Sequence, residues 1–180
     1  RIKRLMGVRN CTLKLKTINL NFWKYISYIS YYARTRRSTT LEIKLVEKND
    51  LIKCTENFIK VFNDEPWNDE WTLLNAQKYL LDFYHTPGFL GIVAIENEEV
   101  IGFIFGVHRT WWSGDEFYIH EMCVESQSQG KGIGKALLDY LIKSLENTTN
   151  ITLLTDRGIP AEAFYKKNGF KEIERLVFLS

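Results

Sequence analysis

The chain has 180 residues, of which 45% are hydrophobic and 26% are charged, so one domain can bury a substantial core. Its three cysteines lie far apart and show no metal-ligand spacing, which argues against a disulfide framework and suits a reducing, cytoplasmic location. No run of 18 apolar residues is present, so stable insertion into a membrane is not expected.

The net charge of +2 conceals a strong asymmetry along the chain. Residues 1–40 hold ten of the 24 Lys and Arg residues and no Asp or Glu, so residues 41–180 carry a net charge of −8. We therefore expect a basic N-terminal extension over residues 1–40 and a folded domain over residues 41–180. The extension could lie on an anionic membrane surface, bind nucleic acid, or have no role in the fold. We favour the third, because the pattern of the domain begins cleanly at Leu41.

The first half of the domain predicts alternating strands and helices. Residues 41–45 alternate as a strand does, and Asp50 is expected to cap a helix whose pattern reaches residue 62. Pro66 interrupts that helix, and a second helix is expected over residues 70–84. Residues 89–96 and 100–107 form the arms of a hairpin with a turn at residues 97–99. A loop over residues 111–115 then leads to a central strand over residues 116–124.

The second half predicts a glycine-rich turn, a helix from Ile133 to Leu145, a strand over residues 150–155 and a helix over residues 159–167. Asn168 and Gly169 end that helix, and residues 170–179 are expected to form a last strand or hairpin. The resulting order is β-α-α-β-β-β-α-β-α-β, which describes a mixed α/β sandwich without an internal repeat.

The glycine-rich turn predicts an anion site. Glycines at the junction of a strand and a helix let a ligand approach the backbone closely. The first amides of the helix have no intrahelical partner and favour an anion such as phosphate, and Lys131 and Lys135 add positive charge. The G-x-G-x-G spacing of this turn fits neither the Rossmann fingerprint nor the P-loop.

Two motifs carry a resemblance to a known family. Gln129, Gly132 and Gly134 form a Q-x-x-G-x-G pattern that resembles the acetyl-coenzyme A (acetyl-CoA) loop of the GNAT superfamily of N-acetyltransferases. Residues 161–170 resemble the A-x-x-F-Y-x-x-x-G-F segment of the family's penultimate helix, and the order of elements over residues 41–180 is that of the family. Residues 65–89 are more loosely similar to the bacterial aminoglycoside 6′-N-acetyltransferases.

The resemblance implies a mostly antiparallel sheet with helices on both faces, splayed between the fourth and fifth main strands. It implies that acetyl-CoA lies in the cleft between these two strands and that no metal takes part. Backbone groups of Met122, Cys123 and Val124 would hold the pantetheine arm. The backbone amides of the glycine-rich turn and of the start of the next helix would bind the pyrophosphate. These residues are Gln129, Gly130, Lys131, Gly132, Ile133, Gly134 and Lys135.

Two residues are candidates for catalysis. Glu121 lies in an apolar strand that would raise its pKa, so we expect it to act as a general base through a water molecule; alternatively, a nearby cation or the sheet edge satisfies it. The alternation of side chains along a strand predicts that His120 points to the opposite face. The resemblance implies that Tyr165 donates a proton to the leaving thiolate, unless it is a core tyrosine. Cys123 is not expected to be a nucleophile.

Acidic and aromatic residues are candidates for the acceptor side, because they suit a cationic amine. The residues predicted to bind substrate are Trp67, Glu70, Trp71, Asp115 and Glu116. Solvated acidic loops with anchoring tryptophans are the alternative. The expected function is acetyl transfer to a primary amine of a small aminoglycoside-like or polyamine-like molecule. Alternatives are a protein or peptide N-acetyltransferase and a non-catalytic acyl-CoA sensor. A homodimer is possible, and no nucleic-acid partner is expected.

Overall fold

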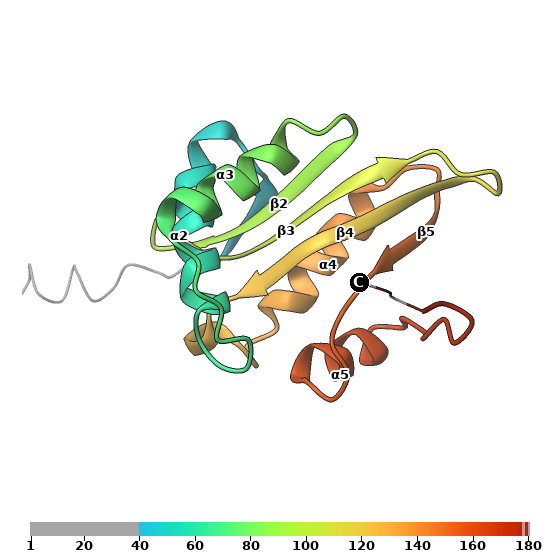
Figure 1. The fold of residues 1–180 in the computed structure, drawn as a ribbon. Coiled ribbons are helices and arrows are strands. Elements are labelled where there is room, and N and C mark those ends of the chain that lie inside the picture. Colours follow the sequence, from blue (N-terminus) through green and yellow to red (C-terminus); the bar gives the residue numbers. More distant parts are fainter. Residues whose placement is uncertain (1–39, 178, 180) are drawn as a thin grey trace, which may run out of the picture. The chain divides into compact units, whose positions relative to one another are not determined.

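The computed structural model describes residues 40–177 and residue 179 (Figure 1). The prediction of a basic extension therefore concerns residues that lie, apart from Thr40, outside the described part of the chain. No helix in the described residues is both long and apolar enough to cross a membrane.

One five-stranded sheet organises the domain, with its strands side by side in chain order. The first three pairings are antiparallel, and the last is parallel. The strands are β1 (Glu42–Leu45), β2 (Phe89–Glu96), β3 (Glu99–Arg109), β4 (Asp115–Val124) and β5 (Thr148–Leu153). Asn97 and Glu98 both have positive φ angles between β2 and β3, as the two central residues of a tight hairpin turn require.

Helices cover both faces of the sheet (Figure 1). Helices α2 and α3 lie on one face and α4 on the other, and α5 follows β5 near the end of the chain. Their bounds are α2 (Leu51–Phe62), α3 (Leu73–Tyr84), α4 (Ile133–Ser144) and α5 (Pro160–Lys167), with short 3₁₀ turns at Lys48–Asp50 and Ser126–Ser128. The predicted order of elements is thus found as far as α5.

The core consists of two layers separated by the sheet. Phe103 and Phe105 of β3 pack with α2 and α3, whereas Ile104 between them packs with α4. This alternation follows from the two-residue period of a strand, and it explains why β3 is apolar from Val100 to Val107. Helix α2 contributes Cys54 and Phe58 at a spacing of four, which places both on one helical face.

Strands β4 and β5 pair over only part of their length. Their register runs from Asp115 opposite Thr148 to Ile119 opposite Leu153, where β5 ends. Strand β4 continues to Val124, so its last five residues have no β5 partner. The sheet therefore opens at this point, as the resemblance implied, and this edge of β4 has no neighbouring strand.

Three local predictions were wrong. Residues 170–177 form a turn and irregular chain rather than a strand, and the apolar side chains of Ile173, Leu176 and Val177 are exposed. A segment forms a strand only where a partner strand is available to it. Asp50 does not cap α2 with its side chain; it instead accepts a 2.9 Å hydrogen bond from the backbone N–H of Glu47, one turn earlier. Thr72 is the cap of α3, which begins at Leu73 rather than residue 70.

Candidate active site

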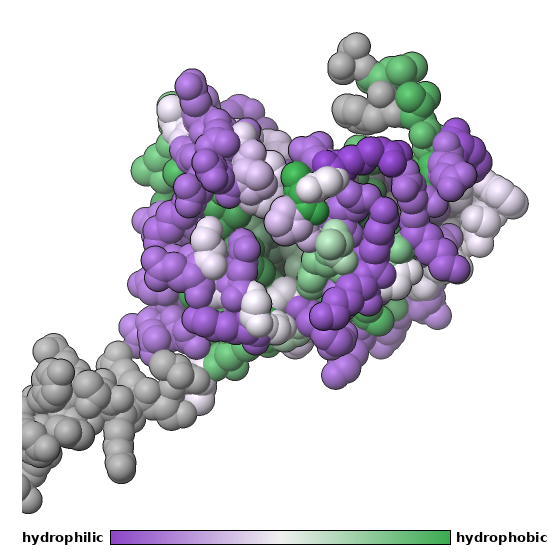
Figure 2. Space-filling view, turned by 90° about the horizontal axis from the view of Figure 1, so that it is seen from below, coloured by the Kyte–Doolittle hydropathy of each residue, from purple (hydrophilic) through white to green (hydrophobic). Residues whose placement is uncertain are grey.

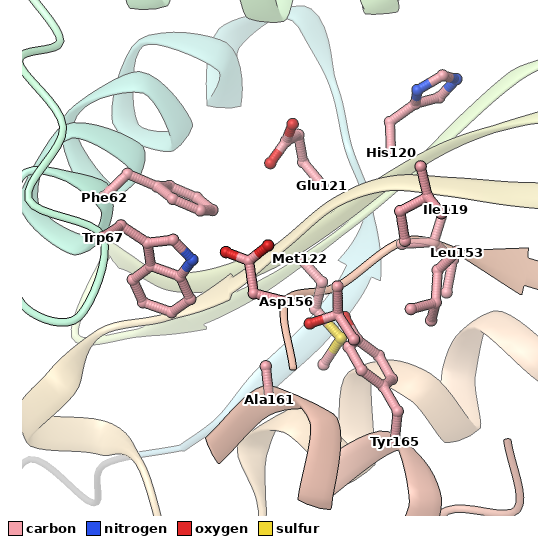
Figure 3. Close-up of a pocket in the computed structure, with 12 residues that line it drawn as sticks. Phe62, Trp67, Ile119, His120, Glu121, Met122, Leu153, Asp156, Ala161 and Tyr165 are labelled. Carbon is pink, nitrogen blue, oxygen red and sulfur yellow. The ribbon is translucent and has the colours of Figure 1, made fainter. Parts of the chain in front are cut away.

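A pocket of about 440 Å³ lies where β4 and β5 separate. Its walls come from the end of α2 and the loop after it, from β4, from the end of β5 and from α5 (Figure 3). The hollowed face in Figure 2 shows hydrophobic residues in the hollow and mostly hydrophilic residues around it. The lining residues are Phe62, Trp67, Ile119, His120, Glu121, Met122, Leu153, Leu154, Thr155, Asp156, Ala161 and Tyr165.

Glu121 is the perturbed carboxyl group of this pocket. Its Oε1 accepts a 2.5 Å hydrogen bond from the hydroxyl group of Tyr79 on α3. Burial raises the pKa of Glu121 to about 7; the Tyr79 hydrogen bond acts against this rise, and the negative charge of Asp69 adds to it. A carboxyl group with this pKa exchanges a proton readily near neutral pH, as a general base must.

A β-bulge in β4 corrects the prediction for His120. Phe105 pairs with Glu121 and Gly106 pairs with Ile119, so His120 is an extra residue without a partner on β3. The bulge breaks the alternation of side chains, and His120 and Glu121 both line the pocket instead of facing opposite sides. The His120 ring packs 4.5 Å from that of Phe83, and desolvation together with the charge of Arg109 lowers its pKa.

Tyr165 lies on α5 at the other wall of the pocket (Figure 3). Its ring packs against Phe164 and Phe170 at 5.3 and 5.5 Å, and only 9% of its surface is exposed. Burial and the nearby charge of Glu121 raise the pKa of its hydroxyl group. This hydroxyl group therefore stays protonated across the neutral range and can donate a hydrogen bond into the pocket.

Two glycines of the glycine-rich turn have a left-handed backbone conformation and face open space. Gly130 and Gly132 have φ angles of +74° and +86°, and a Cβ at either position would meet no atom within 4 Å. The space beside the turn is therefore open, and the first amides of α4 are available to an anion. Gly134 serves packing: its Cβ would lie 3.2 Å from Phe164 and 3.4 Å from the terminal methyl group of Met122. These contacts join the start of α4 to the pocket wall.

The other residues predicted to contact acetyl-CoA surround this turn. Met122, Cys123 and Val124 lie on the part of β4 that has no β5 partner. The side chain of Gln129 donates a 3.0 Å hydrogen bond to the carbonyl oxygen of Val124, which ties the turn to that strand. The Lys135 ammonium group lies 2.6 Å from Asp139, so its charge is shared with a carboxylate. Lys131 and Ile133 lie within the turn and at the first position of α4.

Cys123 has the environment of a structural thiol. It is buried, its Sγ donates a 3.1 Å hydrogen bond to the side-chain oxygen of Asn57, and burial raises its pKa well above the usual value. A thiol that remains protonated and lies inside the core is a poor nucleophile.

The residues predicted to bind the acceptor fall in three places. Trp67 lines the pocket. Trp71 packs against Phe58 and Tyr79 behind the pocket wall, and Glu70 is exposed next to it. Asp115 and Glu116 begin β4, at the opposite end of the strand from Met122, and lie outside the lining. The geometry gives no support to a role of these last two residues in binding the acceptor.

Two residues of the site could not be found from local patterns. Tyr79 lies 42 positions from Glu121, and only the packing of α3 on the sheet brings them together. Asp156, three residues after the end of β5, borders the same cavity as Trp67 and Tyr165 (Figure 3). The described residues contain no group of three or more metal-ligating side chains that could hold a metal ion.

Comparison with known proteins identifies the family. The sequence model of the acetyltransferase (GNAT) family matches residues 52–170, whereas a search of curated proteins finds no match. An integron cassette protein from the mobile metagenome of V. cholerae has a similar structure, with a TM-score of 0.68 and 23% identity over 79% of this chain and 93% of that one.

Two aminoglycoside acetyltransferases also share the fold. One, from an uncultured soil metagenomic sample and in complex with sisomicin, has a TM-score of 0.62 and 19% identity over 78% of this chain and 94% of that one. The aminoglycoside N-acetyltransferase AAC(6′)-Iy in complex with CoA has a TM-score of 0.62 and 15% identity over 81% of this chain and 97% of that one. The family match covers more than half of the sequence, and the predicted fold is confirmed; the chain belongs to the GNAT family of acetyltransferases.

Proposed function

We propose that this acetyltransferase transfers an acetyl group from acetyl-CoA to a primary amine of a small cationic molecule, of the aminoglycoside or polyamine kind. The transfer is direct and takes place with both substrates bound. The observation that carries the proposal is the Glu121 carboxyl group, which lines the pocket with a pKa of about 7.

The acyl donor is assigned to the glycine-rich turn and the free edge of β4. The open space beside Gly130 and Gly132 and the unpaired amides at the start of α4 suit the pyrophosphate of CoA. The edge of β4 at Met122, Cys123 and Val124, which has no β5 partner, would hold the pantetheine arm, as in a strand extended by hydrogen bonds. Acetyl-CoA supplies an acyl carbon already activated as a thioester, so the chain has only to orient it and manage protons.

Glu121 and Tyr165 divide the proton transfers between them. Glu121, directly or through a water molecule, accepts the proton that the ammonium group of the acceptor must lose before its nitrogen can attack the acyl carbon. When the carbon–sulfur bond breaks, the Tyr165 hydroxyl group donates its proton to the sulfur. The nitrogen releases its second proton to solvent as the amide forms, and Tyr165 recovers a proton from solvent. Their positions on opposite walls of the pocket support this division, because the amine and the leaving sulfur lie on opposite sides of the reacting carbon.

The lining of the pocket supports a cationic acceptor. Asp156 and Glu121 are carboxylic acids at its walls, Trp67 offers an aromatic face, and Asp69 lies close enough to Glu121 to raise its pKa. A positively charged amine gains ion-pair and cation–π interactions in such a site. The excess of acidic residues over residues 41–180 attracts cations from a distance.

An amine panel tests the proposal. The full-length chain is incubated with acetyl-CoA and with an aminoglycoside, a polyamine, or a peptide that carries a free N-terminus and a lysine, and thiol release is followed. We expect release with the first two amines. Release with the peptide alone would move the proposal to a protein N-acetyltransferase, and acetyl-CoA binding without release for any amine would favour a sensor.

The cradle itself is tested by Gly132→Val. A β-branched residue at a φ angle of +86° is strained and places methyl groups in the open space beside the turn, so we expect the KM for acetyl-CoA to rise about tenfold or more. Gly169→Val is the matched control, because Gly169 has a φ angle of +92° and open space but ends α5. An unchanged KM in Gly132→Val, measured by thiol release at varied acetyl-CoA, would remove the cradle from this turn.

A further inference from the structure

We propose that Tyr79 is a positioning residue of this enzyme, whose hydroxyl group fixes the Glu121 carboxyl group in the pocket and keeps it available as a proton acceptor. The inference rests on the proposed function, because it assumes that Glu121 is the general base. The contact that carries it is the 2.5 Å hydrogen bond from the Tyr79 hydroxyl group to Oε1 of Glu121. No other described residue donates a hydrogen bond to this carboxyl group.

The Tyr79 ring is held in place by an aromatic cluster. Its centroid lies 5.0 Å from that of Trp71, 4.8 Å from Phe83 and 5.8 Å from Phe58. Trp71 is fixed in turn, because its indole N–H donates a 2.9 Å hydrogen bond to Asp69 and its backbone N–H donates a 2.8 Å bond to Asn63. The phenol therefore reaches Glu121 from a rigid support, which is the arrangement that a precisely oriented base requires.

The environment of Tyr79 and Glu121 keeps the proton of their hydrogen bond on the Tyr79 oxygen. Burial and the neighbouring carboxylate raise the pKa of Tyr79, so it remains a donor while Glu121 gains and loses its proton. The hydrogen bond stabilises the ionised carboxylate and opposes the effect of burial. The other titratable groups near Glu121 or around its pocket are Asp69, Tyr118, His120, Cys123, Asp156 and Tyr165. Of these, the neutral His120, Tyr118, Tyr165 and Cys123 add no positive charge, so Tyr79 is the main stabiliser of the ionised form.

Tyr79→Phe removes the hydroxyl group and keeps the ring. The full-length chain is labelled with ¹³C at the glutamate side-chain carboxyl carbon, and the Glu121 resonance is assigned by its loss in Glu121→Gln. We expect its titration midpoint to move upward by about one pH unit in Tyr79→Phe, since a bond to an ionised group is lost. The acid limb of kcat against pH should move by the same amount, so that kcat falls about fivefold at pH 7 and largely recovers at pH 9.

Tyr84→Phe is the matched control, because Tyr84 lies on the same helix and packs against Phe89 and His85 rather than Glu121. It should leave both the midpoint and the acid limb unchanged. A Glu121 midpoint that is the same in Tyr79→Phe as in the wild type would overturn the inference, whatever the activity. Full activity of Glu121→Gln would instead overturn the proposed function, and the titration would still show whether the Tyr79 contact exists.

Discussion

Glu121→Gln is expected to lower kcat by about 10²–10⁴-fold while changing the KM for acetyl-CoA little. The amide keeps the shape of the carboxyl group and can still accept the hydrogen bond from Tyr79, but it accepts no proton from the amine. Steady-state thiol release with saturating amine measures the effect. A variant with wild-type kcat would exclude Glu121 as the general base.

The pH dependence gives this variant an internal control. Because Glu121 must be ionised to accept a proton and its pKa is about 7, wild-type kcat should rise with pH through about 7, and this limb should be absent in Glu121→Gln.

The stability of the wild-type fold should depend on pH in the opposite direction to kcat. The folded chain holds the Glu121 proton more tightly than the unfolded chain, whose carboxyl groups titrate near 4.5, so the free energy of unfolding should fall as pH rises from about 4.5 through about 7.

The same argument separates lost chemistry from lost folding. Glu121→Gln lacks the buried charge, so its free energy of unfolding should lose this component of pH dependence and match or exceed that of the wild type above pH 7. Denaturant unfolding at pH 5 and pH 8 measures both chains. A variant that is less stable than the wild type at pH 8 would show that the carboxylate contributes to stability and that the loss of activity has a structural component.

Tyr165→Phe is the second large effect, with an expected fall in kcat of about 10²-fold and a normal fold. The ring retains its packing on Phe164 and Phe170, whereas the leaving sulfur loses its proton donor. This role of Tyr165 can be recognised with a different acyl donor. A thioester whose thiol is more acidic needs less help from a proton donor when the thiolate leaves, so Tyr165→Phe should recover activity with such a thioester.

Tyr140→Phe serves as the control for this variant. Tyr140 is a partly buried tyrosine that packs with the α4 side of the core and lies outside the pocket lining. The loss of the Tyr140 hydroxyl group should leave kcat unchanged. If Tyr165→Phe is slowed equally with every thioester, or is not slowed at all, the hydroxyl group is not the donor to sulfur.

The parts of the fold that follow from local patterns could be predicted. The apolar spacing of α2 and α4, the turn at Asn97 and Glu98, and the glycines before Ile133 each depend on neighbours within a few residues. Glu121 could be proposed as a perturbed carboxyl group because its apolar neighbours in the sequence already predict a buried strand.

The other parts depend on partners far away in the chain. The bulge at His120 arises from the register between β3 and β4, which side-chain alternation within β4 does not encode. Tyr79 has the sequence context of an ordinary aromatic residue on an amphipathic helix, and only the approach of α3 to β4 makes it a partner of Glu121. Residues 170–177 show the converse, since a segment predicted to be a strand pairs with no other strand and remains irregular.

Calorimetric titration of the full-length chain with coenzyme A tests the central claim most directly. The assignment of the diphosphate to the first amides of α4 predicts a saturable heat at a ratio of one to one, and a markedly weaker affinity for a CoA fragment that lacks the diphosphate. The absence of any heat, or equal affinity for the fragment, would contradict it.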